Sequence, residues 1–251
     1  GGMKNRSDVL SAVMKIFDPT GIASPFTLLA KKVVQTLCYS GLQWDDALPP
    51  EIAATMNKWI NETPLLKQIG VSRWVGLTSK NQPVTLHTFA DASNIGYGAV
   101  VYVVPDNSSG VYFYTAKSRV SPEKETNVDV NGSTPRLELQ SCIVAIELVT
   151  YIKEYVKMNI TRSIFHTDST VVYYQIQSVN KKFKVFVSNR LNRIRLASSP
   201  EDWRHVPTDL NPADILSRGA MPSDKVAFKK FHEGPSFLRK SIDEWPPLPP
   251  P

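Results

Sequence analysis

Residues 7–62 carry apolar side chains at the spacing of amphipathic helices, interrupted by groups of turn residues. Ser7 and Asp8 are residues that favour a helix start, and Pro25 suits the first turn of a helix. The expected helices cover residues 7–16, 24–41 and a short stretch from Pro50.

After Gln82 the apolar positions take on the spacing of β-strands. Three strands joined by short polar turns indicate an antiparallel meander, expected at residues 83–91, 99–104 and 111–116. Later segments alternate, with helices expected at about 135–155, 169–178, 184–197 and from 211, and strands at 163–168 and 202–206. Strands followed by alternating helices and strands predict an α/β fold, with helices packed on a mixed sheet.

These changes of pattern predict three parts of the chain. Residues 1–80 form a small helical subdomain, 81–222 the α/β domain, and 223–251 a C-terminal extension. The proline-rich end of the extension is expected to be polyproline II or disordered, because proline suits neither helix nor sheet.

The formal net charge of +6 favours a polyanionic partner, although only weakly. No apolar run reaches the length of a membrane span and no signal peptide precedes the first helix, which predicts a soluble intracellular chain without a membrane partner. Cys38 and Cys142 lie in helical patterns, so we expect small buried side chains rather than a disulfide.

Four acidic residues lie where a charge is costly to bury. Asp91 and Asp168 end apolar strands, while Glu138 and Asp214 lie in the expected first turns of two helices. Strand ends and helix starts are places where side chains of separate segments converge. A buried carboxylate cluster implies a metal ion or strong hydrogen bonds, and oxygen ligands without His or Cys indicate Mg²⁺ or Mn²⁺.

Each carboxylate also has a purely structural interpretation. Asp168 suits a helix N-cap, Glu138 and Asp214 suit the helix dipole, and Asp91 suits a turn. Taken singly these interpretations are the better ones, but the four residues together favour a site.

The segments around these residues resemble the four catalytic motifs of retroelement ribonuclease H domains, most closely those of the BEL/Pao class of LTR retrotransposons. They read Thr88-Phe89-Ala90-Asp91, Pro135-Arg136-Leu137-Glu138-Leu139, His166-Thr167-Asp168-Ser169 and Asn211-Pro212-Ala213-Asp214. The resemblance implies a ribonuclease H-like five-stranded mixed sheet and hydrolysis of the RNA strand of RNA/DNA hybrids. It also implies two Mg²⁺ ions, with Mn²⁺ as an alternative: Asp91 shared by both ions, Glu138 and Asp168 on one, Asp214 on the other.

Further residues are expected to bind the hybrid. By motif position, 2′-hydroxyl or backbone contacts are expected from Ser93, Asn94, Arg136, Gln140 and Ser169. Contacts to phosphates are expected from Lys117, Arg119, Lys184, Arg190 and Arg193. For the basic stretch from Lys181 to Arg204, a solvated helix face that touches nothing is an equally good interpretation.

The resemblance extends upstream, since residues 16–46 are similar to the segment that follows the polymerase core in such polyproteins. Residues 1–80 would then be thumb- or connection-like, and the polymerase portion of the same polyprotein would be a partner. Location in the cytoplasm or a retroelement particle is implied, or in the nucleus if the gene has been domesticated. Two departures are a loop, 206–210, without the His of cellular enzymes, and a long polar insert, 121–134. A catalytically silent binding module and a structural connection domain therefore stay open as alternatives.

Overall fold

The computed structural model describes residues 3–106, 108–123 and 133–250, and most of the 121–134 insert lies outside these residues. Its N-terminal part contains three helices, α1 (Arg6–Met14), α2 (Ser24–Tyr39) and α3 (Pro50–Glu62), followed by a 3-10 turn, η1 (Thr63–Gln68). The three predicted helices are therefore confirmed. The cap of α1 is Asn5 rather than Ser7 or Asp8, because its side chain accepts a hydrogen bond from the Asp8 amide.

The N-terminal helices have a core of their own. Phe26 and Trp59 stack with ring centroids 4.6 Å apart, and the Trp59 indole donates a hydrogen bond to the Phe26 carbonyl. Of the two cysteines, Cys142 is buried as expected, whereas the expected burial of Cys38 is wrong because it lies on the outer face of α2; both are free thiols.

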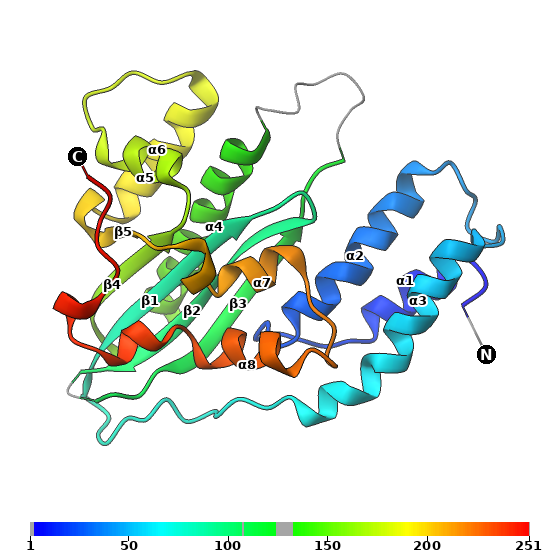
Figure 1. Ribbon diagram of the computed structural model, residues 1–251, viewed down its shortest axis with the longest axis horizontal. Coiled ribbons are helices and arrows are strands. Elements are labelled where there is room, and N and C mark those ends of the chain that lie inside the picture. The colour runs from blue at the N-terminus through cyan, green and yellow to red at the C-terminus, as the bar shows by residue number, and fades with distance from the viewer. Residues whose placement is uncertain (1–2, 107, 124–132, 251) are drawn as a thin grey trace.

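A five-stranded sheet forms the centre of the molecule (Figure 1). The antiparallel meander consists of β1 (Pro83–Ala92), β2 (Gly96–Pro105) and β3 (Tyr112–Val120). The remaining strands, β4 (Asn159–Thr167) and β5 (Trp203–His205), add parallel to β1 and to each other, giving the order β3-β2-β1-β4-β5. The predicted mixed sheet is confirmed. β3 and β4 are longer than expected because each continues into a polar stretch that is only partly buried.

Helices cover both faces of the sheet, which is why β1 and β2 are buried almost throughout. One face packs against α4 (Ser133–Tyr155), with α5 (Thr170–Gln177) and α6 (Val185–Ala197) beside it. The other face is covered by α7 (Ala213–Arg218), α8 (Lys225–Glu233) and the 3-10 turn η4 (Ser236–Arg239). Three short 3-10 turns complete the described chain, η2 (Pro200–Asp202), η3 (Thr208–Leu210) and η5 (Ile242–Glu244).

The C-terminal extension therefore belongs to the packing of the sheet. Phe231 of α8 and Phe237 of η4 are buried in the core of the second face, and α8 is a helix that the apolar spacing of the sequence does not predict. Beyond Trp245, residues 246–250 contain no helix or strand, as expected from their prolines. Among the described residues, no helix combines the length and apolar character needed to cross a membrane.

The N-terminal helices pack directly against the sheet domain, as Figure 1 shows beside β3 and α7. The turn before α2 covers the edge of β3, where Thr20 accepts hydrogen bonds from the Ala116 amide and the Thr115 hydroxyl. Gly21 has φ +76°, and an added Cβ would lie 2.0 Å from the Ala116 carbonyl oxygen. This close approach protects a sheet edge from pairing with other chains.

Candidate active site

Three carboxylates converge at one end of the sheet. Asp91 lies near the end of β1 and Asp168 directly follows β4. The two strands run parallel with Ala90 opposite Thr167, so their carboxyl ends share one edge of the sheet. The helix α4 crosses this edge and brings in Glu138, and one oxygen from each carboxylate lies within 4.8 Å of the others.

The structural interpretations of these three residues do not hold. The N-cap of α5 is Ser169, whose hydroxyl accepts from the Val172 amide, so Asp168 is not the cap. Asp91 belongs to the strand rather than to the turn. Glu138 lies in the second turn of α4, since that helix begins at Ser133 and not near Pro135 as expected, which weakens the helix-dipole explanation.

Burial and mutual repulsion make this cluster unfavourable without a cation. Desolvation, followed by the charge of Asp168, raises the pKa of Asp91 to about 7. Desolvation and then the charge of Asp91 raise the pKa of Glu138 to about 9. Glu138 is only 8% exposed, and its buried Oε2 has no hydrogen-bond donor among the described residues. The three carboxylates therefore form a donor set that fits a hard divalent cation such as Mg²⁺ or Mn²⁺.

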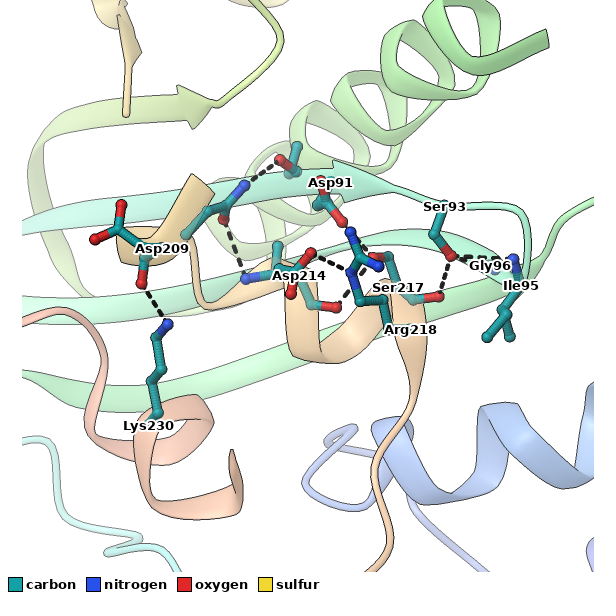
Figure 2. Close-up of polar contacts among 12 residues, drawn as sticks. Asp91, Ser93, Ile95, Gly96, Asp209, Asp214, Ser217, Arg218 and Lys230 are labelled. Carbon is teal, nitrogen blue, oxygen red and sulfur yellow. Dashed lines mark hydrogen bonds and ion pairs between the residues drawn. The ribbon is translucent and has the colours of Figure 1, made fainter. Parts of the chain in front are cut away.

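Asp214, the fourth predicted ligand, lies nearby but outside this group of three. It is the second residue of α7, where its Oδ1 accepts a hydrogen bond of 2.6 Å from the Arg218 Nε (Figure 2). Its charge still contributes to the raised pKa values of Asp91 and Glu138, which places its carboxylate close to theirs. The structure thus brings together Asp91, Glu138 and Asp168, and sets Asp214 beside them. The carboxylate of Asp214 is paired with the guanidinium of Arg218.

Two residues that hold α7 in place were not assigned a role from the sequence. The Ser217 hydroxyl donates a hydrogen bond to Oδ2 of Asp91, and Ser217 is completely buried (Figure 2). The Asn211 side chain, also completely buried, donates to the Ala90 carbonyl and accepts from the Ala213 amide. The signal available in the sequence is the Asn that opens the last motif, Asn211-Pro212-Ala213-Asp214, whereas Ser217 lies three residues beyond it.

Part of the predicted substrate-binding set assembles between α4 and α6. Arg190 of α6 stacks on Phe186, with its guanidinium carbon 3.6 Å from the ring centroid, and donates to the Gln140 side chain. The guanidinium carbon of Arg136 lies 5.2 Å from the same ring. Since Arg136 and Gln140 are four residues apart, they share one face of α4. We refer to these four residues as the Phe186 cluster.

The other predicted substrate contacts do not join this cluster. Arg119 and Arg193 both form ion pairs with Glu147, nine residues beyond Glu138 on α4. The Ser93 hydroxyl donates to the Ser217 carbonyl and so holds the β1–β2 turn to α7 (Figure 2). Ser169 acts as a helix cap, and the exposed remainder of the set comprises Asn94, Lys117 and Lys184.

His205 is the histidine nearest to the carboxylates in the last part of the chain. It ends β5, as expected, and its Nε2 lies 3.1 Å from the Asp168 backbone carbonyl. The loop that follows contains no histidine, so the site has no imidazole from that loop.

The N-terminal helix α2 packs against two elements next to the site, β2 and α7. An added Cβ at Gly96, in the hairpin after Asp91, would lie 2.7 Å from Leu28 of α2. Gly219, at the end of α7, has φ +80°, and its Cβ would lie 2.5 Å from Leu29. The start of β2, which follows the strand of Asp91, and the end of α7, which carries Asp214, therefore both contact α2.

Comparison with solved structures finds several ribonucleases H at low sequence identity. The RNase H1 of the halophilic archaeon Halobacterium salinarum NRC-1 is 13% identical, with 55% of this chain and 91% of that chain covered and a TM-score of 0.33. LC11-RNase H1, solved in complex with an RNA/DNA hybrid, is 15% identical, with 51% and 88% covered and a TM-score of 0.36. The N-terminal RNase H domain of Rv2228c from Mycobacterium tuberculosis is 16% identical, with 52% and 86% covered and a TM-score of 0.34.

Among curated proteins, no match to this chain was found. The family model described as "Pao retrotransposon-like RNaseH-like domain" matches residues 5–169, which include β1, α4 and β4 with their three carboxylates. Because that match spans well over half of the chain, the chain belongs to the family of Pao retrotransposon RNase H-like domains.

Proposed function

We propose that this chain is a metal-dependent endonuclease that hydrolyses the RNA strand of RNA/DNA hybrids during reverse transcription of its retroelement. The observation that carries the proposal is the convergence of Asp91, Glu138 and Asp168 from β1, α4 and β4. A structural role explains this convergence poorly, since a buried oxygen of Glu138 has no donor in the part of the chain that the structure describes and the carboxylates repel each other. Membership of the Pao family supports the same conclusion.

The proposed ligands divide into two groups. Glu138 and Asp168 would hold one divalent ion, Asp214 would hold a second, and Asp91 would contact both. When bound, such ions supply an activated water and neutralise the leaving oxygen of a phosphodiester. The chain's own contribution is positioning: Ser217 fixes the orientation of Asp91, and Asn211 fixes α7 against β1. The buried, low-dielectric surroundings of Glu138 strengthen these charge interactions.

The Phe186 cluster gives the hybrid a place to bind. Arg136 and Arg190 present two guanidinium groups over the Phe186 ring, and arginine binds phosphate through paired hydrogen bonds. Stacking on Phe186 restrains the guanidinium of Arg190, which lowers the entropy lost on binding. Gln140 can exchange hydrogen bonds with a 2′-hydroxyl, the group that distinguishes RNA from DNA.

We further propose that residues 1–80 connect the nuclease to the polymerase portion of the same polyprotein. The support is that α2 packs against both β3 and α7, so the helical part is packed onto the domain that carries the site. A binding-only or purely connecting domain would not need four carboxylates at one edge of the sheet.

The test is a comparison of substrates. The full chain is incubated with end-labelled RNA/DNA hybrid, duplex RNA and duplex DNA of one sequence, with Mg²⁺ or with Mn²⁺. We expect cleavage of the RNA strand of the hybrid alone, and no cleavage after chelation of the metal. Equal cleavage of all three duplexes would contradict hybrid specificity, and salt-dependent hybrid binding without any cleavage would identify a binding module.

A further inference from the structure

Arg218 lies at the edge of the carboxylate cluster, where its guanidinium forms an ion pair with Asp214. It is the last residue of α7, and its Nε lies 2.6 Å from Oδ1 of Asp214. Figure 2 shows the Arg218 side chain beside Asp214 and Asp91. The hydrogen bond to Asp214 and the charge of that carboxylate raise the pKa of Arg218, and the charges of Asp91 and Asp168 add to the rise, so the guanidinium is in the field of three carboxylates.

The remaining carboxylates of the site have no such partner. Within residues 3–106, 108–123 and 133–250, no lysine or arginine forms an ion pair with Asp91, Glu138 or Asp168. Those three form one compact donor set, whereas Asp214 turns a carboxylate oxygen to Arg218. The site therefore has one compact metal-binding position and one position where a guanidinium already neutralises the ligand.

We infer that Arg218 takes the place of the second cation in the substrate-free chain, so that a second divalent ion binds only after Arg218 has left Asp214. This inference rests on the proposed function, because it concerns the ligands of the same site. Arg218 is a positioning residue in this scheme, since it acts through Asp214.

We expect the ion pair between Arg218 and Asp214 to dissociate readily. The Arg218 side chain is 64% exposed, and an exposed pair between residues four apart on a helix is weak and screened by salt. A guanidinium released from Asp214 can bind a phosphate of the nucleic acid through two parallel hydrogen bonds. The substrate backbone would thus compete with Asp214 for Arg218. By linkage, substrate and second ion would each raise the affinity of the site for the other.

Manganese binding measures this directly, without any reaction. Metal-free full chain is titrated with Mn²⁺ in the absence of nucleic acid, and free Mn²⁺ is followed by electron paramagnetic resonance. The chain should bind one ion tightly, and Arg218→Gln should bind two, the second at least ten-fold more tightly than in the unsubstituted chain. Arg218→Lys keeps the cation and should retain one tight site.

Two controls make the result specific. Arg193→Gln removes another exposed guanidinium, paired with Glu147 away from the site, and should leave one tight ion. Asp214→Asn in the Arg218→Gln background should return the stoichiometry to one. Because Arg218 is exposed, the fold should survive, and Arg218→Ala repeats the test with a smaller side chain.

Several results would overturn the inference. Two tight ions in the unsubstituted chain, or one in both Arg218→Gln and Arg218→Ala, would show that Arg218 does not control the second position; hybrid cleavage would then remain a valid separate test of the function. Absence of Mn²⁺ binding in every variant would overturn the proposed metal site as well.

Discussion

The Ser217 hydroxyl donates a hydrogen bond to Oδ2 of Asp91 and so joins the last helix of the site to its first strand. This bond lowers the pKa of Asp91, against the raising effects of burial and of Asp168. It also fixes the direction of one carboxylate oxygen of Asp91, Oδ2, and so restricts the orientations in which this carboxylate can bind a cation.

Substitution of Ser217 by alanine should weaken metal binding without unfolding the chain. The loss of a hydrogen bond that orients a ligand lowers metal affinity by about 10–100-fold in other sites. Isothermal titration with Mn²⁺ measures the effect. Ser236→Ala, on the exposed side of η4, is the matched control and should bind Mn²⁺ as the unsubstituted chain does. An unchanged affinity in Ser217→Ala would contradict the orienting role.

Replacement of Glu138 by glutamine should stabilise the metal-free protein. The folded pKa is about 9 and the ordinary value is 4.5, so the folded state binds the proton more tightly than the unfolded state. The resulting penalty is absent below about pH 4.5 and grows as the pH rises towards 9. At pH 7 it reaches at most about 3.5 kcal/mol, at about 1.4 kcal/mol per pH unit.

Urea unfolding in the presence of a chelator checks this at pH 5, 7 and 9. The gain in the free energy of unfolding for Glu138→Gln should increase with pH, and Mg²⁺ should stabilise only the unsubstituted chain. Glu147→Gln, which loses two exposed ion pairs instead, should show no gain. A Glu138→Gln protein that is less stable at every pH would refute the prediction that the buried charge of Glu138 destabilises the metal-free protein.

The buried histidine pair predicts the opposite pH dependence. Nδ1 of His87 lies 3.1 Å from Nε2 of His166, and burial followed by the charges of Arg162 and Arg204 lowers the pKa of His87 from 6.5 to about 3. Between about pH 3 and pH 6.5 the His87 side chain is therefore protonated in the unfolded chain and neutral in the folded chain. Stability is complete above about pH 6.5 and falls by about 1.4 kcal/mol per pH unit below it.

His87→Gln removes this titrating group and should lose less stability than the unsubstituted chain between pH 7 and pH 5, by about 2 kcal/mol. Urea unfolding at the two pH values gives the difference directly, and the carboxylate contributions cancel between the two proteins. An identical loss in both proteins would mean that His87 is not held in its neutral form.

Substitutions at two glycines distinguish the effect of backbone strain from the effect of the contact between α2 and α7. Gly219 and Gly41 both have positive φ, but an added Cβ meets Leu29 at Gly219 and nothing within 4 Å at Gly41. Gly41→Ala should cost only the conformational penalty, about 1 kcal/mol. Gly219→Ala should cost clearly more and also weaken Mn²⁺ binding, because α7 must shift and carry with it Ser217, which orients Asp91. Equal losses of thermal stability in the two variants would show that the contact with α2 is unimportant.

The strands and the carboxylate cluster could be predicted because they depend on local pattern. Alternating apolar residues fix the strands, and an acidic residue at the end of such a strand, as at Asp91 and Asp168, is a signal that the sequence carries by itself. The helix α8 was missed because Phe228 and Phe231 are its only buried residues among several lysines.

The rest depended on contacts between distant segments. The bond between Ser217 and Asp91 follows from the rotation of α7 about its own axis, which no periodicity specifies. The predicted phosphate contacts of Arg119 and Arg193 were inferred from charge alone, and their shared partner, Glu147, is evident only once β3 and α6 are placed on either side of α4.

The central claim is that Asp91 belongs to a metal-dependent hybrid nuclease. The most direct measurement is cleavage of an end-labelled RNA/DNA hybrid in Mg²⁺ by the full chain and by Asp91→Asn, with folding of both checked by circular dichroism. We expect cutting of the RNA strand by the unsubstituted chain and a loss of about a hundred- to a thousand-fold in Asp91→Asn, the scale of a missing charge-stabilising group. Equal cutting by the two proteins would contradict it.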